Sequence, residues 1–158
     1  MKHTDDDAFW LTWCKEELAK GRAVHLPAKG LSMLPSIWPK TILSIEQKSF
    51  TDVEVGEVIA FERNLQFVVH RVVKKMVSQG LQEVYTQGDS NWHLDELISE
   101  AQYIGAITGK VVAAQFKPIE RPSQIILFLV RLAMSIYRFA IRIYSKAKQI
   151  FRSTPPYK

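Results

Sequence analysis

Four residues in three separated segments form a set of the kind that serine nucleophile chemistry uses. Ser32 lies in the Gly- and Pro-containing segment 29–35, His70 follows an apolar run, and Asp89 and Asp95 belong to a third segment rich in turn residues. A serine hydroxyl needs a base within hydrogen-bonding reach. A neutral imidazole is such a base, and a carboxylate on its second ring nitrogen fixes its tautomer. The set predicts a nucleophile, a base and two candidate orienting carboxylates.

Each of these residues alone also has an ordinary structural explanation. A serine or a Gly-Asp pair in such segments is usually a turn residue, and a histidine at the end of a strand is usually structural. His93 is near Asp95 and is a second-choice base, and His25 falls on a predicted strand. The histidine spacing does not match a metal site, so neither a metal nor a cofactor is predicted.

The elements that must position this set are predicted between residues 22 and 117. Short apolar runs separated by Gly, Pro, Asn and Asp are typical of closely spaced strands, which indicates an antiparallel sheet or a distorted barrel. The candidate strands are Val24–Leu26, Ile42–Ile45, Val58–Phe61, Phe67–Val73, Glu83–Thr86 and Thr108–Phe116. The mainly β domain is preceded by an N-terminal segment, residues 1–21, in which residues 5–20 are predicted to form a helix. We expect this helix to have an apolar side of Phe9, Trp10, Trp13 and Leu18, and Cys14 to be a packed small residue.

The C-terminal part of the chain differs in composition. Residues 118–122 read as a linker, 123–152 as an amphipathic helix and 153–158 as a tail. At 100° per residue the arginines of this helix form a narrow stripe on an otherwise wide apolar surface. The longest uninterrupted apolar run has six residues, short of the ~20 of a simple membrane span. A helix lying in the membrane interface is the favoured interpretation. A protein interface, a core-packing helix and a span with partnered arginines are alternatives.

The charge of the chain is uneven. Residues 121–158 contain eight basic and no acidic residues, whereas residues 1–120 contain 13 basic and 16 acidic ones. This asymmetry predicts an anionic partner for the C-terminal helix, with a membrane surface preferred and no nucleic acid expected. The chain begins with three acids among its first seven residues, where a secretory leader needs basic ones. We therefore expect a cytoplasmic protein, peripheral on the inner face of the membrane.

Five ordered segments resemble the type I signal peptidases. That family has a Ser-Met-x-Pro box, a Gly-Asp-Ile-Val strand start, a base followed by Arg, a Lys-Gly-Asp-x-Asn box with a further acid, and a closing Gly-Lys-Val-Val strand. The similar segments here are SMLP at 32–35, GEVI at 56–59, HR at 70–71, GDSN at 88–91 with Asp95, and GKVV at 109–112. The resemblance covers about residues 24–114.

The resemblance implies a function and a branch of the family. Most bacterial members and the LexA-type self-cleaving repressors have Lys where His70 stands, whereas the archaeal and endoplasmic-reticulum enzymes have His. By this resemblance Ser32 is the nucleophile, His70 the base and Asp95 the residue that orients it, with Asp89 shaping or assisting the site. It also implies cleavage of a leader or signal-like peptide after small residues, with the substrate bound as an extended strand.

Several departures from the family pattern mark the chain as divergent. Gln87 replaces the Lys of the Lys-Gly-Asp box, and Glu57 replaces an Asp. The helix that usually anchors the family ahead of the serine is missing from the roughly 30 residues before Ser32. The main alternative is a peptide-binding or membrane-associated module of the same fold that has lost catalysis. A LexA-like repressor would need a helix-turn-helix, for which these residues leave no room.

Overall fold

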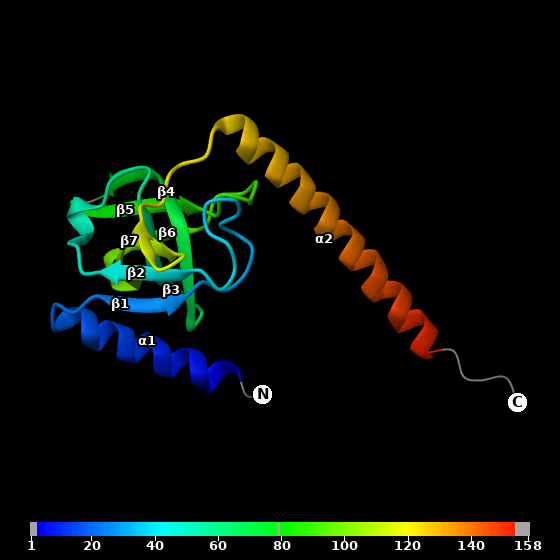
Figure 1. Cartoon of the computed structure of the whole chain (residues 1–158), viewed down its shortest axis with the longest axis horizontal. Helices are drawn as coiled ribbons and strands as arrows, with labels where there is room; N and C mark the ends of the chain where they lie inside the picture. Colours follow the sequence, from blue (N-terminus) through cyan, green and yellow to red (C-terminus); the bar gives the residue numbers. More distant parts are fainter. Residues whose placement is uncertain (1–2, 79, 154–158) are drawn as a thin grey trace, which may run out of the picture.

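The computed structural model describes residues 3–78 and 80–153 and consists of one antiparallel sheet with a helix at each end of the chain. Figure 1 shows α1 beside β1 and the long α2 extending away from the sheet. The helices are α1 (His3–Ala19) and α2 (Gln124–Ser153), with short 3-10 turns at Phe50–Asp52 and Glu100–Gln102. The strands are β1 (Val24–Pro27), β2 (Ile42–Glu46), β3 (Val58–Arg63), β4 (Gln66–Ser78), β5 (Leu81–Gln87), β6 (Leu97–Ser99), β7 (Tyr103–Val112) and β8 (Gln115–Lys117).

The sheet is antiparallel throughout and open. Its strand order is β1-β2-β7-β3-β4-β5-β6, with β8 paired to β7, and β1 and β6 are not paired with each other. The predicted antiparallel sheet is confirmed. The sheet does not close into a barrel, so the barrel alternative is wrong to that extent. The hairpin between β3 and β4 turns through Asn64 and Leu65, whose φ angles are 53° and 60°. Two consecutive residues with positive φ match the twist of the flanking strands, as tight hairpin turns require.

The predicted strand Thr108–Phe116 is wrong as a single element. It comprises the end of β7 and the start of β8, which form a hairpin. The turn is made by Ala113 and Ala114, both with positive φ, at 50° and 59°. Alanine carries no turn signal, because the left-handed conformation is costly for residues with a Cβ. The short strand β6 was also not predicted, since it has only three residues.

Helix α1 packs on the sheet with a face that matches the expected one only in part. Leu11, Cys14 and Leu18 are buried, whereas Phe9 and Trp10 are exposed. Residues three and four apart lie on one face of a helix, and this spacing places Leu11, Cys14 and Leu18 together. Of the expected apolar side, Leu18 is buried and Trp13 packs against the core, so the prediction is confirmed for these two and wrong for Phe9 and Trp10. The burial of Cys14 agrees with its predicted packing role, and burial raises the pKa of its thiol to about 11.

Strand β3 lies at the centre of the sheet and has both faces covered. Val58 and Ala60 belong to the core beneath α1, and Ile59 and Phe61 belong to a second core on the other face. Successive residues of a strand point to opposite faces, so a strand buried on both sides is continuously apolar. The second core is closed by Phe50, Val53, Val72, Val84 and Ile98. The two cores make β3 and its neighbour β4 a rigid support for residues near the start of β4.

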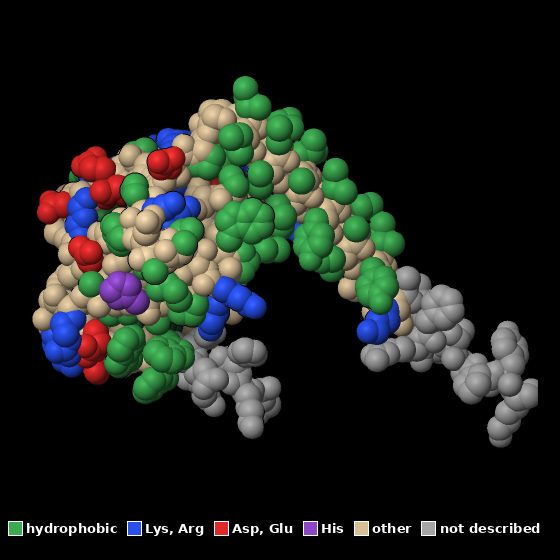
Figure 2. All heavy atoms as spheres, in the orientation of Figure 1, with side chains coloured by type: hydrophobic (Ala, Val, Ile, Leu, Met, Phe, Trp, Pro, Cys, Tyr) green, Lys and Arg blue, Asp and Glu red, His purple; other side chains and the backbone are tan. Residues whose placement is uncertain are grey.

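Helix α2 is long and mostly exposed. Among the described residues, Gln124–Lys146 is the one segment long and apolar enough to cross a membrane by length and composition alone. Only 6% of the apolar 18-residue stretch within this segment is buried in the structure, so α2 is not a core helix. Figure 2 shows apolar side chains along its outer surface. The alternative of a core-packing helix is therefore wrong.

Candidate active site

Ser32 lies in the long turn between β1 and β2, and this turn is attached to the segment after β5. The Ser32 carbonyl oxygen accepts a hydrogen bond of 2.8 Å from the Ser90 backbone N–H. The Ser90 hydroxyl donates to the Leu31 carbonyl at 2.9 Å. None of the hydrogen bonds described in the structure uses the backbone N–H of Ser32. That N–H therefore remains available to a negative oxygen developing beside the serine.

His70 links the serine to a carboxylate. Its Nε2 lies 3.0 Å from the Ser32 hydroxyl oxygen, and its Nδ1 lies 2.5 Å from Oδ2 of Asp95. The His70 side chain is 4% exposed and packs edge-on against the Phe61 ring. Since Asp95 accepts the Nδ1–H, Nε2 carries the lone pair that faces Ser32. The structure thus brings Ser32, His70 and Asp95 into one hydrogen-bonded chain.

Asp95 is held in place by three donors. Its Oδ2 also accepts from the Thr86 hydroxyl at 2.7 Å, and its Oδ1 accepts from Nη1 of Arg63 at 2.9 Å. Its backbone N–H donates to the Thr86 carbonyl at 2.8 Å. Burial raises the pKa of Asp95, but His70, Thr86 and Arg63 together outweigh burial, so its pKa is lowered from the ordinary value. The carboxylate is consequently charged and fixed beside the imidazole.

Gly88 lies against both the serine loop and the histidine. A Cβ at this position would lie 2.7 Å from the Ser32 carbonyl oxygen, 2.7 Å from the Asn91 side-chain nitrogen and 3.0 Å from His70 Nε2. Real Cβ atoms do not approach other heavy atoms at 2.7 Å, so the backbone here accepts only glycine without a shift. The absence of a side chain at Gly88 is what lets the segment after β5 approach the serine so closely.

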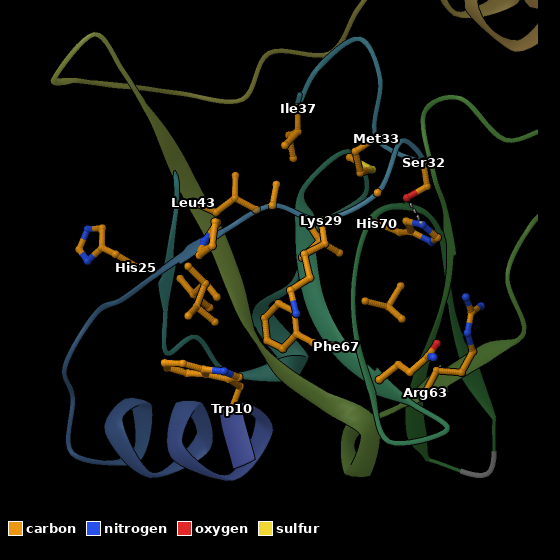
Figure 3. Close-up of a pocket in the computed structure, with 18 of the residues that line it drawn as sticks. Trp10, His25, Lys29, Ser32, Met33, Ile37, Leu43, Arg63, Phe67 and His70 are labelled. Carbon is orange, nitrogen blue, oxygen red and sulfur yellow. Dashed lines mark hydrogen bonds between the residues drawn. The ribbon is translucent and has the colours of Figure 1, made fainter. Parts of the chain in front are cut away.

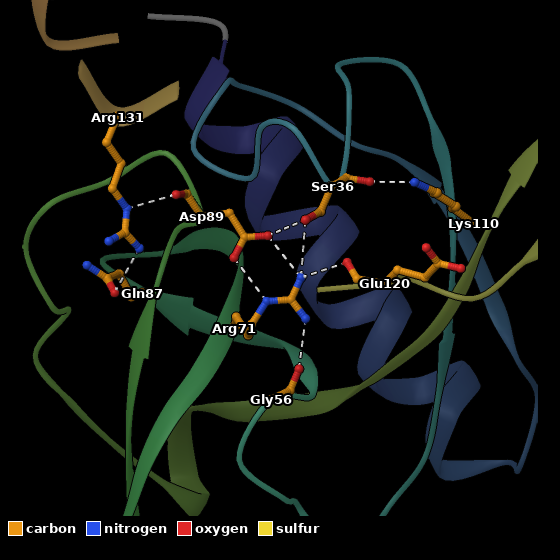
Figure 4. A network of polar contacts seen from close by, with 8 residues as sticks. All are labelled: Ser36, Gly56, Arg71, Gln87, Asp89, Lys110, Glu120 and Arg131. Atoms are coloured by element: carbon orange, nitrogen blue, oxygen red, sulfur yellow. Dashed lines mark hydrogen bonds and ion pairs between the residues drawn. The ribbon is translucent and has the colours of Figure 1, made fainter. Parts of the chain in front are cut away.

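Asp89 does not join the chain of Ser32, His70 and Asp95. Its carboxylate accepts two hydrogen bonds of 2.9 Å from Arg71 and one from the Ser36 hydroxyl, as Figure 4 shows. Arg71 also donates to the Gly56 carbonyl at 2.8 Å, and the side chains of Arg71 and Asp89 are 3% and 4% exposed. Arg71 and Asp89 therefore form a buried ion pair. The role of Asp89 is to fasten the segment after β5 to the serine loop and β4.

A deep cleft leads to the serine. Its volume is about 790 Å³, and Figure 3 shows Ser32 and His70 at one end and Trp10 of α1 at the other. The apolar lining includes Met33, Ile37, Leu43, Phe67 and Val69, and its basic side chains are His25, Lys29, Arg63 and His70. None of the described residues that line it is acidic. The cleft suits an extended, largely apolar ligand.

Two strand edges border this cleft. β1 pairs with β2 on one side only, and residues 66–70 of β4 pair with β3 but precede the register in which β4 pairs with β5. Residues of both segments line the cleft. Unpaired strand edges present free backbone N–H and C=O groups that another strand can use. Both segments therefore present backbone groups to the cleft that have no strand partner among the described residues.

The remaining candidates lie elsewhere. His93, the second-choice base, is exposed, and no described hydrogen bond joins it to Ser32. His25 lines the cleft from β1. Within the described residues, no group of three or more His, Cys, Asp or Glu side chains is arranged to hold a metal ion.

Three contributors to the site were not recognised in the sequence. Thr86 and Arg63 both bind Asp95, and Gly88 provides the close approach to Ser32. Thr86 and Arg63 lie at ordinary strand positions with no motif around them. Gly88 had a visible signal, its place in the Gly-Asp segment, but a turn explained it equally well.

Comparison of the chain with protein-family models and with curated protein sequences gives no match.

Proposed function

We propose that this protein is a serine endopeptidase of the signal-peptidase type, cleaving an extended leader or signal-like peptide. The observation that carries the proposal is the hydrogen-bonded chain Ser32–His70–Asp95 at the end of a large apolar cleft. A nucleophile, a base in contact with it and a group that orients the base are the three parts that acyl transfer by a serine requires.

The proposed reaction follows from the atoms in contact. The Ser32 oxygen attacks the scissile carbonyl carbon while its proton passes to Nε2 of His70, 3.0 Å away. The imidazolium that forms is stabilised by Asp95, and the backbone N–H of Ser32 donates to the oxyanion. His70 then protonates the leaving amine, which leaves an acyl ester on Ser32. Water, deprotonated by His70, hydrolyses this ester and restores the serine hydroxyl.

The substrate is proposed to bind as a strand between β1 and the start of β4. Both edges are free to form main-chain hydrogen bonds, and the cleft between them ends at Ser32. Main-chain pairing holds an extended peptide in one register, and side-chain pockets then select the sequence. The apolar lining favours uncharged residues upstream of the scissile bond.

The outer surface of α2 is proposed to bind a membrane. Its exposed apolar residues include Ile125, Leu129, Leu132, Ile136, Phe139 and Ile143. An arginine at the centre of a bilayer costs roughly 3 kcal/mol. Arg131 and Arg138 of α2 instead bind backbone and side-chain groups of the domain. Because spanning would pull these arginines from their partners, α2 is proposed to lie parallel to the membrane surface.

A labelling experiment tests the peptidase proposal. The full chain in vesicles or mild detergent is treated with a fluorophosphonate probe and, separately, with a library of apolar peptides whose products are identified by mass spectrometry. We expect labelling and cleavage that Ser32→Ala abolishes. Ser78→Ala, at an exposed serine of β4, is the matched control and should leave both unchanged. If the chain binds peptides but cleaves none, it is instead the peptide-binding module that has lost catalysis.

Vesicle flotation tests the membrane proposal. The full chain should float with phosphatidylcholine vesicles, and more strongly when phosphatidylserine is added, since Lys146 and Lys148 attract anionic lipid. The double variant Ile136→Asp/Phe139→Asp should stay at the bottom of the gradient, whereas Arg142→Ala should float. Binding of double-stranded DNA without flotation would contradict the proposal.

A further inference from the structure

The first half of α2 contacts the segment after β5 through one arginine in particular. Nε of Arg131 donates to the Asp89 carbonyl at 3.1 Å, and its Nη2 donates to the Gln87 side-chain oxygen at 3.2 Å. Its guanidinium also lies 5.8 Å from the centre of the Trp92 ring. Figure 4 shows Arg131 reaching from α2 to both residues that flank Gly88. One side chain therefore holds the segment 87–92 at several points.

Further residues of the same helix face continue this contact. Ser135 accepts a hydrogen bond of 2.9 Å from the Trp92 indole N–H, and Nη2 of Arg138 donates to the Asn91 side-chain oxygen at 2.8 Å. Positions 131, 135 and 138 are four and three apart, so they share one face of α2. Leu127, one turn earlier, is 3% exposed. The arginine stripe predicted from the sequence thus faces the domain over its first half.

The opposite side of segment 87–92 touches the reacting groups. Its Ser90 N–H binds the Ser32 carbonyl, and Gly88 approaches His70 Nε2 so closely that a Cβ would lie 3.0 Å from it. The chain then continues directly to Asp95. Segment 87–92 therefore lies between α2 on one side and Ser32 and His70 on the other.

We propose that α2 is a working part of the active site, in which Arg131 is a positioning residue that holds segment 87–92 against Ser32 and His70. This inference rests on the proposed function for its catalytic consequence. A displacement of about 1 Å in a catalytic group can lower turnover by as much as about a hundredfold. Arg131 is half-buried and binds two acceptors on either side of Gly88, so its loss releases the segment where it matters most.

The proposed membrane contact and the contact with segment 87–92 use different sides of α2. The face with Leu127, Arg131 and Ser135 contacts segment 87–92, and the exposed apolar residues cover the rest of the helix surface. The two contacts are therefore compatible, and α2 can bind a membrane without releasing segment 87–92.

Kinetics of three variants of the full chain test whether Arg131 holds segment 87–92 in its catalytic position. Arg131→Ala should lower kcat by about tenfold or more, with KM within about twofold, because the substrate cleft does not contain Arg131. Arg131→Lys should be intermediate, since one ammonium binds the Asp89 carbonyl but lacks the fork that reaches Gln87 as well. Arg142→Ala, on the exposed part of the same stripe, is the matched control and should equal the wild type. An unchanged kcat in Arg131→Ala overturns the inference.

Hydrogen exchange separates this inference from the proposed function. In a Ser32→Ala background, where no reaction occurs, Arg131→Ala should raise amide exchange at Ser90 and in segment 87–92 by at least tenfold, while exchange in β3 stays unchanged. Equal exchange overturns the inference. If the wild type neither reacts with the fluorophosphonate nor cuts peptides, the proposed function fails, and this exchange comparison alone decides whether Arg131 holds the segment.

Discussion

Nδ1 of His70 lies 2.5 Å from Oδ2 of Asp95, although the two residues are 25 positions apart in the chain. His70 belongs to the first part of β4, which pairs with β3 alone, and Asp95 belongs to the irregular segment between β5 and β6. The backbone N–H of Asp95 binds the Thr86 carbonyl, which ties that segment to the end of β5. The orientation of the imidazole therefore depends on a short loop held at both ends.

Asp95→Asn tests the orienting role of the carboxylate. The amide can donate to Nδ1, which favours the tautomer with its proton on Nε2 and removes the base from Ser32. We expect kcat to fall by about 10⁴-fold with little change in KM, as for a triad aspartate that fixes a tautomer. Peptide cleavage under saturating substrate measures this. Asp52→Asn, at an exposed acid outside the cleft, is the control and should retain full activity. A loss of less than tenfold in Asp95→Asn would contradict the assignment.

Acid stability follows from the lowered pKa of Asp95. The folded protein binds a proton on this carboxyl less readily than the unfolded chain, so the carboxylate stabilises the fold above its ordinary pKa of about 3.9. That contribution is lost as the pH falls through the lower folded pKa. The difference in unfolding free energy between wild type and Asp95→Asn should therefore shrink on acidification below about pH 4. Urea unfolding at several pH values measures it, and a difference independent of pH would contradict the lowered pKa.

Gly88→Ala tests the close approach of segment 87–92 to the serine. The added Cβ would lie 2.7 Å from the Ser32 carbonyl oxygen, so one of the two segments must move. We expect a loss of about 1–3 kcal/mol in unfolding free energy, as for overpacked sites. Labelling of Ser32 should slow more than this loss of stability explains. Gly80→Ala changes a glycine where a Cβ meets open space, although its φ of 80° adds backbone strain. It should lower stability without slowing the labelling of Ser32.

The buried pair Arg71 and Asp89 makes a separate prediction about stability. Asp89→Leu leaves the Arg71 guanidinium buried without a counter-charge, and we expect a cost of about 3–5 kcal/mol. The double variant Arg71→Met/Asp89→Leu removes both charges and should be more stable than the single variant. Thermal and urea unfolding of the wild type, Asp89→Leu and the double variant measure these differences in stability. A double variant less stable than Asp89→Leu would show that the Arg71 bonds to Gly56 and Ser36 dominate instead.

The strands of the fold were largely predictable, because apolar runs of four to eight residues between turn signals are a local pattern. Val24, Ile42 and Val58 start their strands where expected. The turn at Ala113 and Ala114 was not predictable, since its strained backbone is imposed by pairing of β7 with β8. The buried face of α1 was predicted only in part, because four bulky side chains around Leu11 and Cys14 are apolar too, and apolarity alone does not determine the docking direction.

The candidate site was predictable in its members but not in its supports. Ser32, His70 and Asp95 were expected together from ordered motifs, and the structure places them in contact. The contribution of Arg131 depends on how α2 returns to the domain after the linker. This is a tertiary arrangement 42 residues from Asp89 in the chain, with no local signal. The stripe of arginines was visible, but its partner was not.

The open edge of β1 also bears on how the protein behaves when it is concentrated. An edge strand with free backbone groups will accept any extended chain, including the same edge of a second molecule. β1 is short, with four residues, and ends in Pro27, which lacks a backbone N–H and limits how far such a false partner can extend. Self-association through this edge should therefore be weak and concentration-dependent. A bound peptide should suppress it, so light scattering with and without substrate offers a physical measure of cleft occupancy that requires no catalysis.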